Sequence, residues 1–568
     1  MYKIAVTILL WALVANNAAQ AQRRAKRAKP KPARTTVVKA LPTTPPPSTR
    51  TDEMDTLPTK NVLITSAYKP NLLPATKLNF GAAPIAASIK KPNLAYVIPN
   101  QNLVFSFLPA SIQPLQLFVD TSSVWENSQY IKVGYGNFQT PFAEAAFSTG
   151  SLQKQFVGIQ LGHTQNTGSI NLQEFAKTYV QATGVWQGSQ FKNSVTAGWE
   201  RTAQNQYGIA NNFIGNKDSL QRNFTTLQAG WELISQRPNN SGIATHTKLK
   251  YTLFSDNFSN REHTIQAALP FTKLLNSNST VHFELGGQWA MLTANTTFTN
   301  SIVTIQPGYQ FTRKKASIYV GVQPTFTNNT LYWLPQVKLQ HPIGSTPLTA
   351  LAGAQGAVTL NSYRNLAGIN PFLNPIETAQ NTIDNRYYVG VKAVLNKHVN
   401  AQASVAYHSM QQAVLWLNNT QKMHQLQAVF ANTLQALRLK GEIHYTLQQK
   451  LEAGVGITLT DFQRNSEAAA WGLLPIELSA QTKWWVLPGL QVNSQLHFWD
   501  GALYKNNQNQ EQKLPAALIW NLGANYNFMP KWSVWLQANN LLNNRYQRWH
   551  SLPALGTNIM GGIVYSFK

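Results

Sequence analysis

The sequence ends in GGIVYSFK, from Gly561 to Lys568, and the side chains of this stretch alternate in character. Ile563, Tyr565 and Phe567 share one parity, opposite to that of Lys568. A period of two places successive side chains on opposite faces of a β-strand. Chain termini are usually polar and frayed unless a sheet holds them. The pattern therefore predicts that the last residues form a structural strand.

The same texture extends back to Tyr130. Segments of about ten residues alternate between apolar and polar or small side chains, and short turns rich in Asn, Gly, Asp and Ser separate them. The polar positions hold mostly Gly, Asn, Gln, Ser and Thr, and only 12% of all residues are charged. A soluble β-sandwich usually places Lys and Glu there instead. Units of roughly 20 residues predict an all-β fold, a large transmembrane antiparallel β-barrel of about 20–22 strands over residues 129–568.

A barrel in lipid must close its first strand on its last, because an open strand edge finds no hydrogen-bond partner there. GGIVYSFK is therefore the predicted closing strand. Aromatic side chains are abundant, and in such barrels they gather at the two lipid–water interfaces. The predicted interface aromatics lie near strand ends and are Trp484, Trp485, Trp520, Trp532 and Trp535.

The N-terminus predicts export. Lys3 precedes an apolar run over residues 4–14, and Ala19, Gln20 and Ala21 form a small-x-small cleavage site. This is the pattern of a signal peptide, here residues 1–21. The run is too short to span a membrane, and no later segment approaches the roughly 18 apolar residues of a transmembrane helix.

Two further segments precede the predicted barrel. Residues 22–60 carry ten Lys or Arg against three acids, a net charge of +7, and are rich in proline. They predict a disordered periplasmic linker, or alternatively a basic arm that binds a periplasmic partner. Residues 61–128 contain seven prolines that break every apolar stretch. We expect an extended segment there, and its place in the periplasm or in the lumen stays open.

The formal net charge is +25, and the chain contains no cysteine. For an exported protein this balance predicts contact with anionic lipid and lipopolysaccharide, and no nucleic acid. Lys132, Arg386 and Lys392 lie in strand-like segments, where inward-facing cations would favour anionic solutes. The alternative is that most cations sit at turns and rims, facing lipid phosphates.

Residues that could carry chemistry are few. His408, His444 and His497 fall on the polar parity of their strands, either as lumen ligands or as ordinary wall residues. The sequence contains no G-x-S-x-G, no H-E-x-x-H and no phosphate-binding loop. We therefore predict no enzyme, no cofactor and no metal site.

The last 37 residues, 532–568, resemble the C-terminus of TonB-dependent outer-membrane receptors. The resemblance implies that the outer-membrane assembly machinery recognises Ile563, Tyr565 and Phe567. Lys568 departs from the usual terminal aromatic. The residues that match the family's terminal motif are Asn540, Leu541, Leu542, Asn543, Tyr546, Trp549, Pro553 and Gly556.

Other features of these receptors match less well. Residues 61–67 resemble the family's coupling peptide but lack its acidic start, and the region before Tyr130 is too short and too rich in proline for an ordinary plug domain. The chain is closer to plug-less, receptor-like outer-membrane barrels, which share the stretch 68–72 and the first hairpin, 134–144. The resemblance implies a Gram-negative outer-membrane location with a periplasmic N-terminal segment.

Two functions remain open. The first is a channel or receptor-like transport protein for an unidentified solute. The second is a structural or assembly protein, whose barrel anchors an N-terminal arm that docks other envelope components.

Overall fold

The computed structural model of the chain describes residues 129–567, except 153, 209–219, 374–375, 377, 420–424 and 448–449. The predicted signal peptide, basic linker and Pro-broken segment lie outside the described residues. Their boundaries stay predictions.

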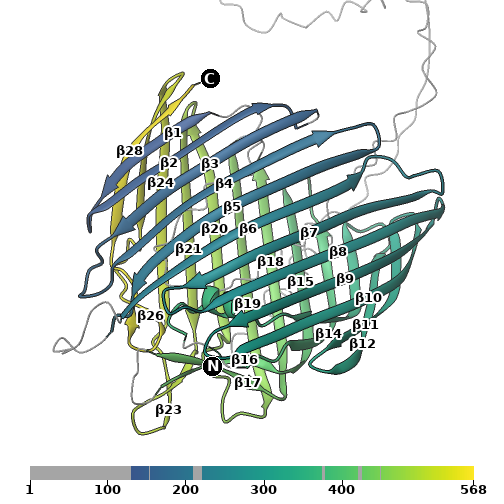
Figure 1. Ribbon diagram of the computed structural model, residues 1–568. Helices are drawn as coiled ribbons and strands as arrows, with labels where there is room; N and C mark the ends of the chain where they lie inside the picture. Colours follow the sequence, from purple (N-terminus) through teal and green to yellow (C-terminus); the bar gives the residue numbers. More distant parts are fainter. Residues whose placement is uncertain are drawn as a thin grey trace, which may run out of the picture. The chain divides into compact units, whose positions relative to one another are not determined.

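Twenty-two antiparallel strands form one closed sheet (Figure 1). Neighbouring strands in the sheet follow one another along the chain, apart from short strands that belong to connecting loops. The barrel strands are β1 (Tyr130–Gly136), β2 (Thr140–Gly150), β3 (Gln155–Asn166), β4 (Phe175–Gln187), β5 (Phe191–Asn205), β6 (Gln221–Ser235), β7 (Ile243–Asp256), β8 (Arg261–Asn276), β9 (Ser279–Thr293), β10 (Thr297–Arg313), β11 (Ala316–Thr327), β12 (Thr330–Pro342), β13 (Leu348–Thr359), β14 (Thr382–Val394), β15 (Val399–Gln411), β18 (Leu434–Leu447), β19 (Leu451–Asn465), β20 (Ile476–Leu487), β21 (Leu490–Asp500), β24 (Ala517–Met529), β25 (Trp532–Asn539) and β28 (Asn558–Ser566).

The connections contain regular structure of their own. The elements described there are the hairpins β16 (Ala413–Asn418) with β17 (Leu426–Ala431), β22 (Leu503–Lys505) with β23 (Glu511–Lys513), and β26 (Gln547–Trp549) with β27 (Leu552–Pro553), and the helix α2 (Tyr363–Ile369). Among the described residues, no helix is long and apolar enough to cross a membrane.

The predicted closure is confirmed. β28 pairs with β25 on one side and with β1 on the other. At this seam Ile131 lies opposite Tyr565, and Val133 lies opposite Ile563. Beyond the strand, the backbone N–H of Phe567 donates to the Gln129 carbonyl at 2.9 Å. The all-β prediction and the expected strand number are therefore correct.

The two faces of the wall have the predicted chemistry, as β3 shows. Val157, Ile159 and Leu161 point outward and are 41–53% exposed. Their neighbours Gly158 and Gln160 point inward. Large apolar side chains on the outside and small or amide side chains on the inside suit lipid and water respectively. The barrel is a transmembrane barrel.

The two ends of the barrel differ. At one end, where Phe567 also lies, the connections are short turns such as 277–278, 314–315 and 488–489. At the other end they include the long segments 206–220, 360–381, 412–433, 501–516 and 540–557. We call these the turn end and the loop end. In outer-membrane barrels the short turns face the periplasm and the long loops face the exterior.

The predicted interface aromatics divide between the two faces. Trp484, Trp520 and Trp532 point outward and are 37–49% exposed. Trp485 lies on the opposite face of its strand from Trp484, because adjacent side chains alternate. Trp535 is 4% exposed and points into the barrel. The prediction that Trp535 lies at the lipid–water interface is therefore wrong. Its parity is opposite to that of Trp532, so its side chain points to the other face of the strand.

Trp535 instead braces the seam from inside. Its indole Nε1 donates to the Val133 carbonyl of β1 at 3.2 Å, reaching across β28. The Nζ atom of Lys132 lies 4.4 Å from the Trp535 ring centroid and 5.1 Å from that of Phe142. A Cβ on Gly134 would lie 2.3 Å from the indole. Gly134 thus leaves the space that lets β25 reach β1.

Deleting residues 565–568 should prevent assembly. The deletion removes Tyr565, which pairs with Ile131 on one side and Trp532 on the other, and so leaves strand edges open in lipid. The measurement is the amount of heat-modifiable barrel in the outer-membrane fraction, with deletion of Lys568 alone as control. A normal level of the 565–568 deletion would contradict the role given to this strand.

The Trp535→Ala variant should fold into a less stable barrel. Removing a buried Trp costs about 3–5 kcal/mol, and here it also frees the Val133 carbonyl and the Lys132 ammonium. Urea unfolding in detergent gives the free energy of unfolding. Trp532→Ala, three residues away on the outer face, is the matched control, and equal losses in both variants would exclude a special role for the seam.

Candidate functional site

Several of the connections at the loop end share one hydrophobic core. Its members come from strands spread around the circumference, so the core has to cross the mouth of the barrel. We call this core, with the loops that carry it, the cap. The buried members are Leu172, Tyr207 and Leu220 after β3 and β5, Phe224, Phe254 and Leu292 at strand ends, Tyr363, Leu366, Ala367, Phe372 and Leu373 between β13 and β14, Trp416 and Leu426 between β15 and β18, and Trp549 and Leu552 between β25 and β28.

The helix α2 is fixed to the wall by two carboxylates. Glu262, at the start of β8 and 1% exposed, accepts the backbone N–H groups of Tyr363 at 2.5 Å and Arg364 at 3.2 Å. Ser362 caps the helix by accepting the Asn365 N–H at 3.2 Å. The Tyr363 hydroxyl donates to Asp256 Oδ2 at 2.7 Å. The helix N-terminus, with its free N–H groups, is a favourable place for a carboxylate.

The end of the β13–β14 connection is held by Asn381, which is fully buried. Its amide nitrogen donates to Asn300 Oδ1 at 2.6 Å and to Thr327 Oγ1 at 2.7 Å. Its amide oxygen accepts the Asn361 backbone N–H at 3.1 Å. One side chain thus joins the connection to β10 and β11.

Two tryptophans meet in the cap. Trp416 and Trp549 have ring centroids 5.5 Å apart. Gly472 lies against both, with φ of +68°, and a Cβ there would come within 2.8 Å of Trp416 and 2.9 Å of Trp549. Only glycine meets both demands readily.

Arg548 is buried beside this pair. Its guanidinium lies 4.1 Å from the Trp549 ring centroid, and Nη2 donates to the Gly472 carbonyl at 2.9 Å. Burial lowers the pKa of Arg548 to about 10, and the charge of Glu477 opposes that change. Its Nε and Nη1 atoms have no hydrogen-bond partner among the described residues.

The residues of the terminal motif build the last loop of the cap. Asn540 donates from Nδ2 to the carbonyls of Asn544 and Leu555, both at 2.9 Å, and accepts the Asn544 N–H at 3.1 Å. Asn543 accepts the Thr557 N–H at 3.1 Å. Both Asn540 and Asn543 have positive φ, which asparagine tolerates better than most residues. The asparagines of the motif therefore fix the conformation of the β25–β28 connection, a role that the resemblance alone did not imply.

Other motif residues pack in the same loop. Tyr546 stacks edge-on against Trp499 with ring centroids 5.0 Å apart. Gly556 lies against Asn543, whose Oδ1 would be 2.7 Å from an added Cβ. Leu542 is 47% exposed and contributes little to the core. The roles predicted for Ile563, Tyr565 and Phe567 in assembly stay predictions.

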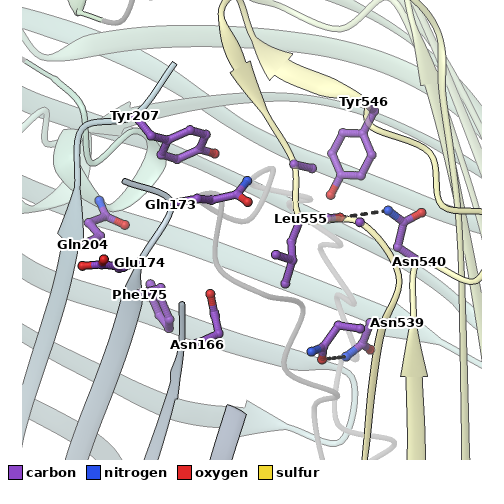
Figure 2. A pocket seen from close by; sticks show the side chains of 13 residues that line it. Asn166, Gln173, Glu174, Phe175, Gln204, Tyr207, Asn539, Asn540, Tyr546 and Leu555 are labelled. Atoms are coloured by element: carbon purple, nitrogen blue, oxygen red, sulfur yellow. Dashed lines mark hydrogen bonds between the residues drawn. The ribbon is translucent and has the colours of Figure 1, made fainter. Parts of the chain in front are cut away.

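A pocket lies where the last loop of the cap faces the first barrel strands (Figure 2). It has a volume of about 50 Å³. One side is formed by residues at the ends of β3, β4 and β5, and the other by the β25–β28 connection. Its lining includes Gln173, Glu174, Gln204, Tyr207, Asn540 and Tyr546.

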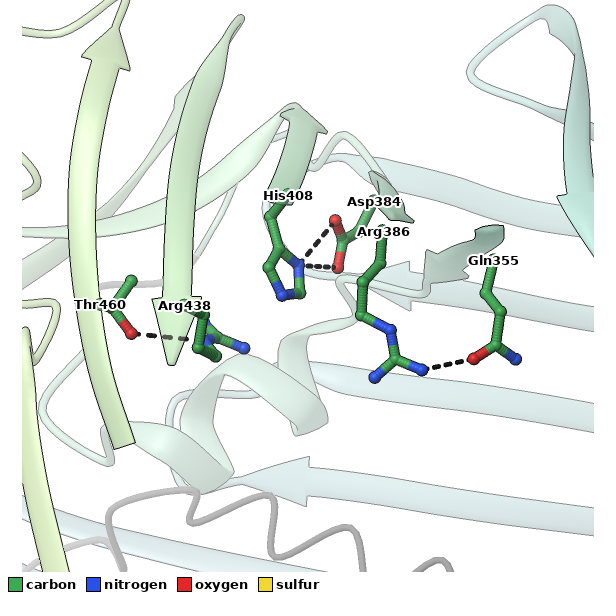
Figure 3. Close-up of polar contacts among 6 residues, drawn as sticks. All are labelled: Gln355, Asp384, Arg386, His408, Arg438 and Thr460. Atoms are coloured by element: carbon green, nitrogen blue, oxygen red, sulfur yellow. Dashed lines mark hydrogen bonds and ion pairs between the residues drawn. The ribbon is translucent and has the colours of Figure 1, made fainter. Parts of the chain in front are cut away.

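Polar side chains on the inner wall lie close to the cap, at the loop ends of β14, β15 and β18 (Figure 3). His408 contacts Asp384 through Nδ1 at 2.9 Å. Arg386 donates to the Gln355 side chain, and Arg438 donates from Nε to Thr460 Oγ1 at 3.3 Å. The strand register brings these groups together, since Arg386 lies opposite both Gln355 and His408.

Part of the positive charge on the inner wall is paired with carboxylates. Three inward-facing lysines pair with carboxylates, Lys177 with Glu200 at 3.0 Å, Lys248 with Glu232 at 3.2 Å, and Lys440 with Glu442 at 2.5 Å. Other cations, such as Arg313, Lys314 and Lys531, lie at the turn end. Cations therefore lie both at the rim and on the inner wall, where Lys132, Lys338 and Arg386 are further examples.

The predicted histidines do not converge. His408, His444 and His497 lie on β15, β18 and β21, each on the inner face of its strand. Among the described residues, no three His, Asp or Glu side chains form a group that could hold a metal ion.

The cap itself was not predicted from the sequence. Its signal is a set of large apolar side chains inside long connections, such as Leu366, Phe372 and Trp416. Connections on a protein surface are usually polar, so these residues indicate loops that pack rather than extend into water.

No protein-family model and no curated protein sequence matches the chain. Its fold matches solved outer-membrane barrels. The FrpB iron transporter from Neisseria meningitidis (F3-3 variant) aligns with a TM-score of 0.60 at 10% identity, covering 78% of this chain and 81% of that one. A mutant form of the ferric enterobactin receptor PfeA from Pseudomonas aeruginosa gives 0.58 at 9% identity, covering 78% and 80%. The copper transporter OprC gives 0.57 at 11%, covering 78% and 80%.

These likenesses confirm the predicted resemblance to the barrels of TonB-dependent outer-membrane receptors. Those proteins are described as transporters and a receptor. At such low identity the likeness concerns the fold.

The phenols of the cap should report whether the cap is closed. Burial raises the pKa of Tyr207, Tyr363 and Tyr546, all of which lie in the connections. The neutral phenols therefore stabilise the closed cap fully below the ordinary tyrosine pKa of about 10. This stabilisation is lost as the pH rises through the raised pKa values. In an alkaline titration, phenolate absorbance should show a late phase.

A variant with a disrupted cap, Leu366→Glu, should move this late phase toward the ordinary value. Leu366 is 1% exposed in the core, where an unpaired carboxylate is strongly unfavourable. A native protein whose tyrosines all titrate together near the ordinary value would contradict a closed cap.

Proposed function

We propose that this protein is a transport barrel of the outer membrane whose loops gate the lumen. The observation that carries the proposal is the cap, one hydrophobic core across the mouth of a barrel with a polar inner face. A barrel of this size encloses an aqueous space wide enough for solutes. Closing its mouth makes passage depend on movement of the loops.

The make-up of the cap supports a gate rather than a permanent seal. Several buried polar atoms in or next to the core have no hydrogen-bond partner among the described residues, including Gln206 Nε2, Asn370 Nδ2, Arg548 Nε and Trp549 Nε1. Each such atom costs about 1–3 kcal/mol. Exposure to water on opening recovers this cost and offsets part of the lost apolar burial. Closed and open states therefore lie closer in free energy than the apolar core alone implies.

The similarity in fold to an iron transporter, a ferric enterobactin receptor and a copper transporter also supports a transport role. The solute itself is left unassigned. Absence of an ordinary plug, a periplasmic N-terminal segment, contact with lipopolysaccharide, and recognition of Ile563, Tyr565 and Phe567 by the assembly machinery remain parts of the proposal.

The competing function is a structural or docking protein, in which residues 22–128 bind other envelope components. The unpartnered polar atoms of the cap favour transport, because an anchoring barrel would close its mouth more stably with an entirely apolar core.

The test is conductance in planar bilayers. We expect the native chain to be closed or nearly so, and Leu366→Glu to open large conductance steps, because a carboxylate in the core forces the loops apart. Leu542→Glu is the matched control, since Leu542 is an exposed leucine of the same end of the barrel. Heat-modifiable migration confirms that each variant has formed a barrel.

Each variant is measured in the full chain and in a chain that lacks residues 22–128, so that any block by that segment is seen separately. Silence of Leu366→Glu in both backgrounds would overturn the gate. Equal conductance of the native chain and Leu366→Glu would do so as well, because the cap would then not limit passage.

A further inference from the structure

The pocket of Figure 2 has a lining that suits an uncharged ligand. Amide side chains dominate it, and no Lys or Arg lines it. An anionic group would enter without a compensating cation, which is costly in a partly buried site. The carboxylate of the lining, Glu174, lies at the exposed rim, where it accepts a hydrogen bond from Asn205 Nδ2 at 3.0 Å.

Two buried groups of this pocket lack partners. Gln204 is 5% exposed and Tyr207 is 4% exposed. The Gln204 Nε2 atom and the Tyr207 hydroxyl have no hydrogen-bond partner among the described residues. A buried N–H or O–H without a partner costs about 1–3 kcal/mol. A leucine and a phenylalanine at these positions would close the cap at least as well, so closure alone does not account for the polar atoms.

The remaining lining is already committed to the cap. The Gln173 amide lies near the Tyr207 hydroxyl, but its nitrogen donates to the Pro553 carbonyl at 2.8 Å and its oxygen accepts the Ser169 N–H at 2.9 Å. Asn540 donates to the Leu555 carbonyl at 2.9 Å. The Gln173–Pro553 bond joins the two sides of the pocket and fixes its shape. The Gln204 amide nitrogen and the Tyr207 hydroxyl are therefore unpartnered donors in the lining of a preformed pocket, and Glu174 is an acceptor at its exposed rim.

Aromatic rings complete the lining. Tyr207 and Tyr546 come from opposite sides of the pocket, and each is held by a ring behind it, Phe372 at 5.5 Å and Trp499 at 5.0 Å between centroids. Rings beside amide and carboxylate groups offer both apolar faces and hydrogen-bond partners to one ligand.

We propose that this pocket binds a neutral carbohydrate residue from the exterior. A hydroxyl group both donates and accepts, so one ligand of this class satisfies the Gln204 and Tyr207 donors and the Glu174 acceptor together. A carboxylate accepts only, and an ammonium group donates only. A volume of about 50 Å³ takes a hydroxyl or hydroxymethyl group, with the sugar ring at the mouth. The proposal does not depend on whether the barrel transports.

The test is saturation-transfer NMR on the full chain with a panel of glucose, galactose, mannose and N-acetylglucosamine. The detergent must lack a sugar head group, because a maltoside would compete. Glucosamine and glucose 6-phosphate are the charged counterparts, and a short neutral peptide tests the other ligand class. We expect at least one neutral sugar to bind, and to bind better than the charged or peptide ligands.

Tyr207→Phe removes only the hydroxyl and should weaken binding about fivefold, equivalent to about 1 kcal/mol for one hydrogen bond. Gln204→Leu should weaken it by a similar factor. Gln206→Leu is the matched control, because Gln206 is 3% exposed and has an unpartnered Nε2 but does not line the pocket.

The stability of the variants separates binding from a structural role. Removing an unpartnered buried polar atom is neutral or stabilising, so Tyr207→Phe and Gln204→Leu should bind sugar more weakly while keeping the thermal stability of the native chain. The proposal is overturned by three results: no neutral sugar binds, only charged sugars or the peptide bind, or Gln206→Leu loses as much affinity as Gln204→Leu.

Discussion

The structure depends on the pairing of β1 with β28. In lipid every backbone N–H and C=O group needs an internal partner, so a sheet of this kind is stable only when its two edges meet. β1 is a short strand, Tyr130–Gly136, and its register with β28 runs over its full length. Trp535 adds a bond from β25 to β1 on the inner face. The lipid-facing alternation of the other strands follows once the sheet is closed, because each must present one face to lipid and the other to the lumen.

Closure creates a second requirement at the loop end. A closed sheet of 22 strands leaves a wide mouth, and the long connections fill it with a core of their own. The wall supplies the fixed points. Glu262 and Asp256 bind α2, and Asn381 fixes the end of the connection between α2 and β14. Asn540 shapes the connection between β25 and β28. Short-range polar bonds thus position the loops, and apolar contacts between loops close the mouth.

The barrel could be predicted from the sequence because a period of two is local: Ile563, Tyr565 and Phe567 carry it in five residues. The inward orientation of Trp535 follows from its parity, which is opposite to that of Trp532, whereas its position near a strand end indicates an interface residue. The cap and its pocket were beyond such reasoning. Gln204, Tyr207 and Tyr546 meet only because strands far apart in the chain close into one ring, and no local pattern specifies which loops then touch. His408, His444 and His497 illustrate the same limit, since parity placed them inward but could not show that they stay apart.

The polar atoms in the cap are the strongest argument that its loops do more than close the mouth. A core selected only for closure would replace the Arg548 guanidinium and the Tyr207 hydroxyl by apolar groups, because both are buried and incompletely bonded. Arg548 retains one bond, to the Gly472 carbonyl, and stacks on Trp549. Movement of the β25–β28 loop away from Gly472 would break this bond and hydrate the free N–H groups of Arg548 in the same step. The loop that carries Arg548 also forms one side of the pocket. Occupation of the pocket and the position of this loop are therefore coupled through the same backbone. A ligand that binds the closed pocket stabilises the closed cap. A ligand that fits better when the two sides of the pocket separate favours opening.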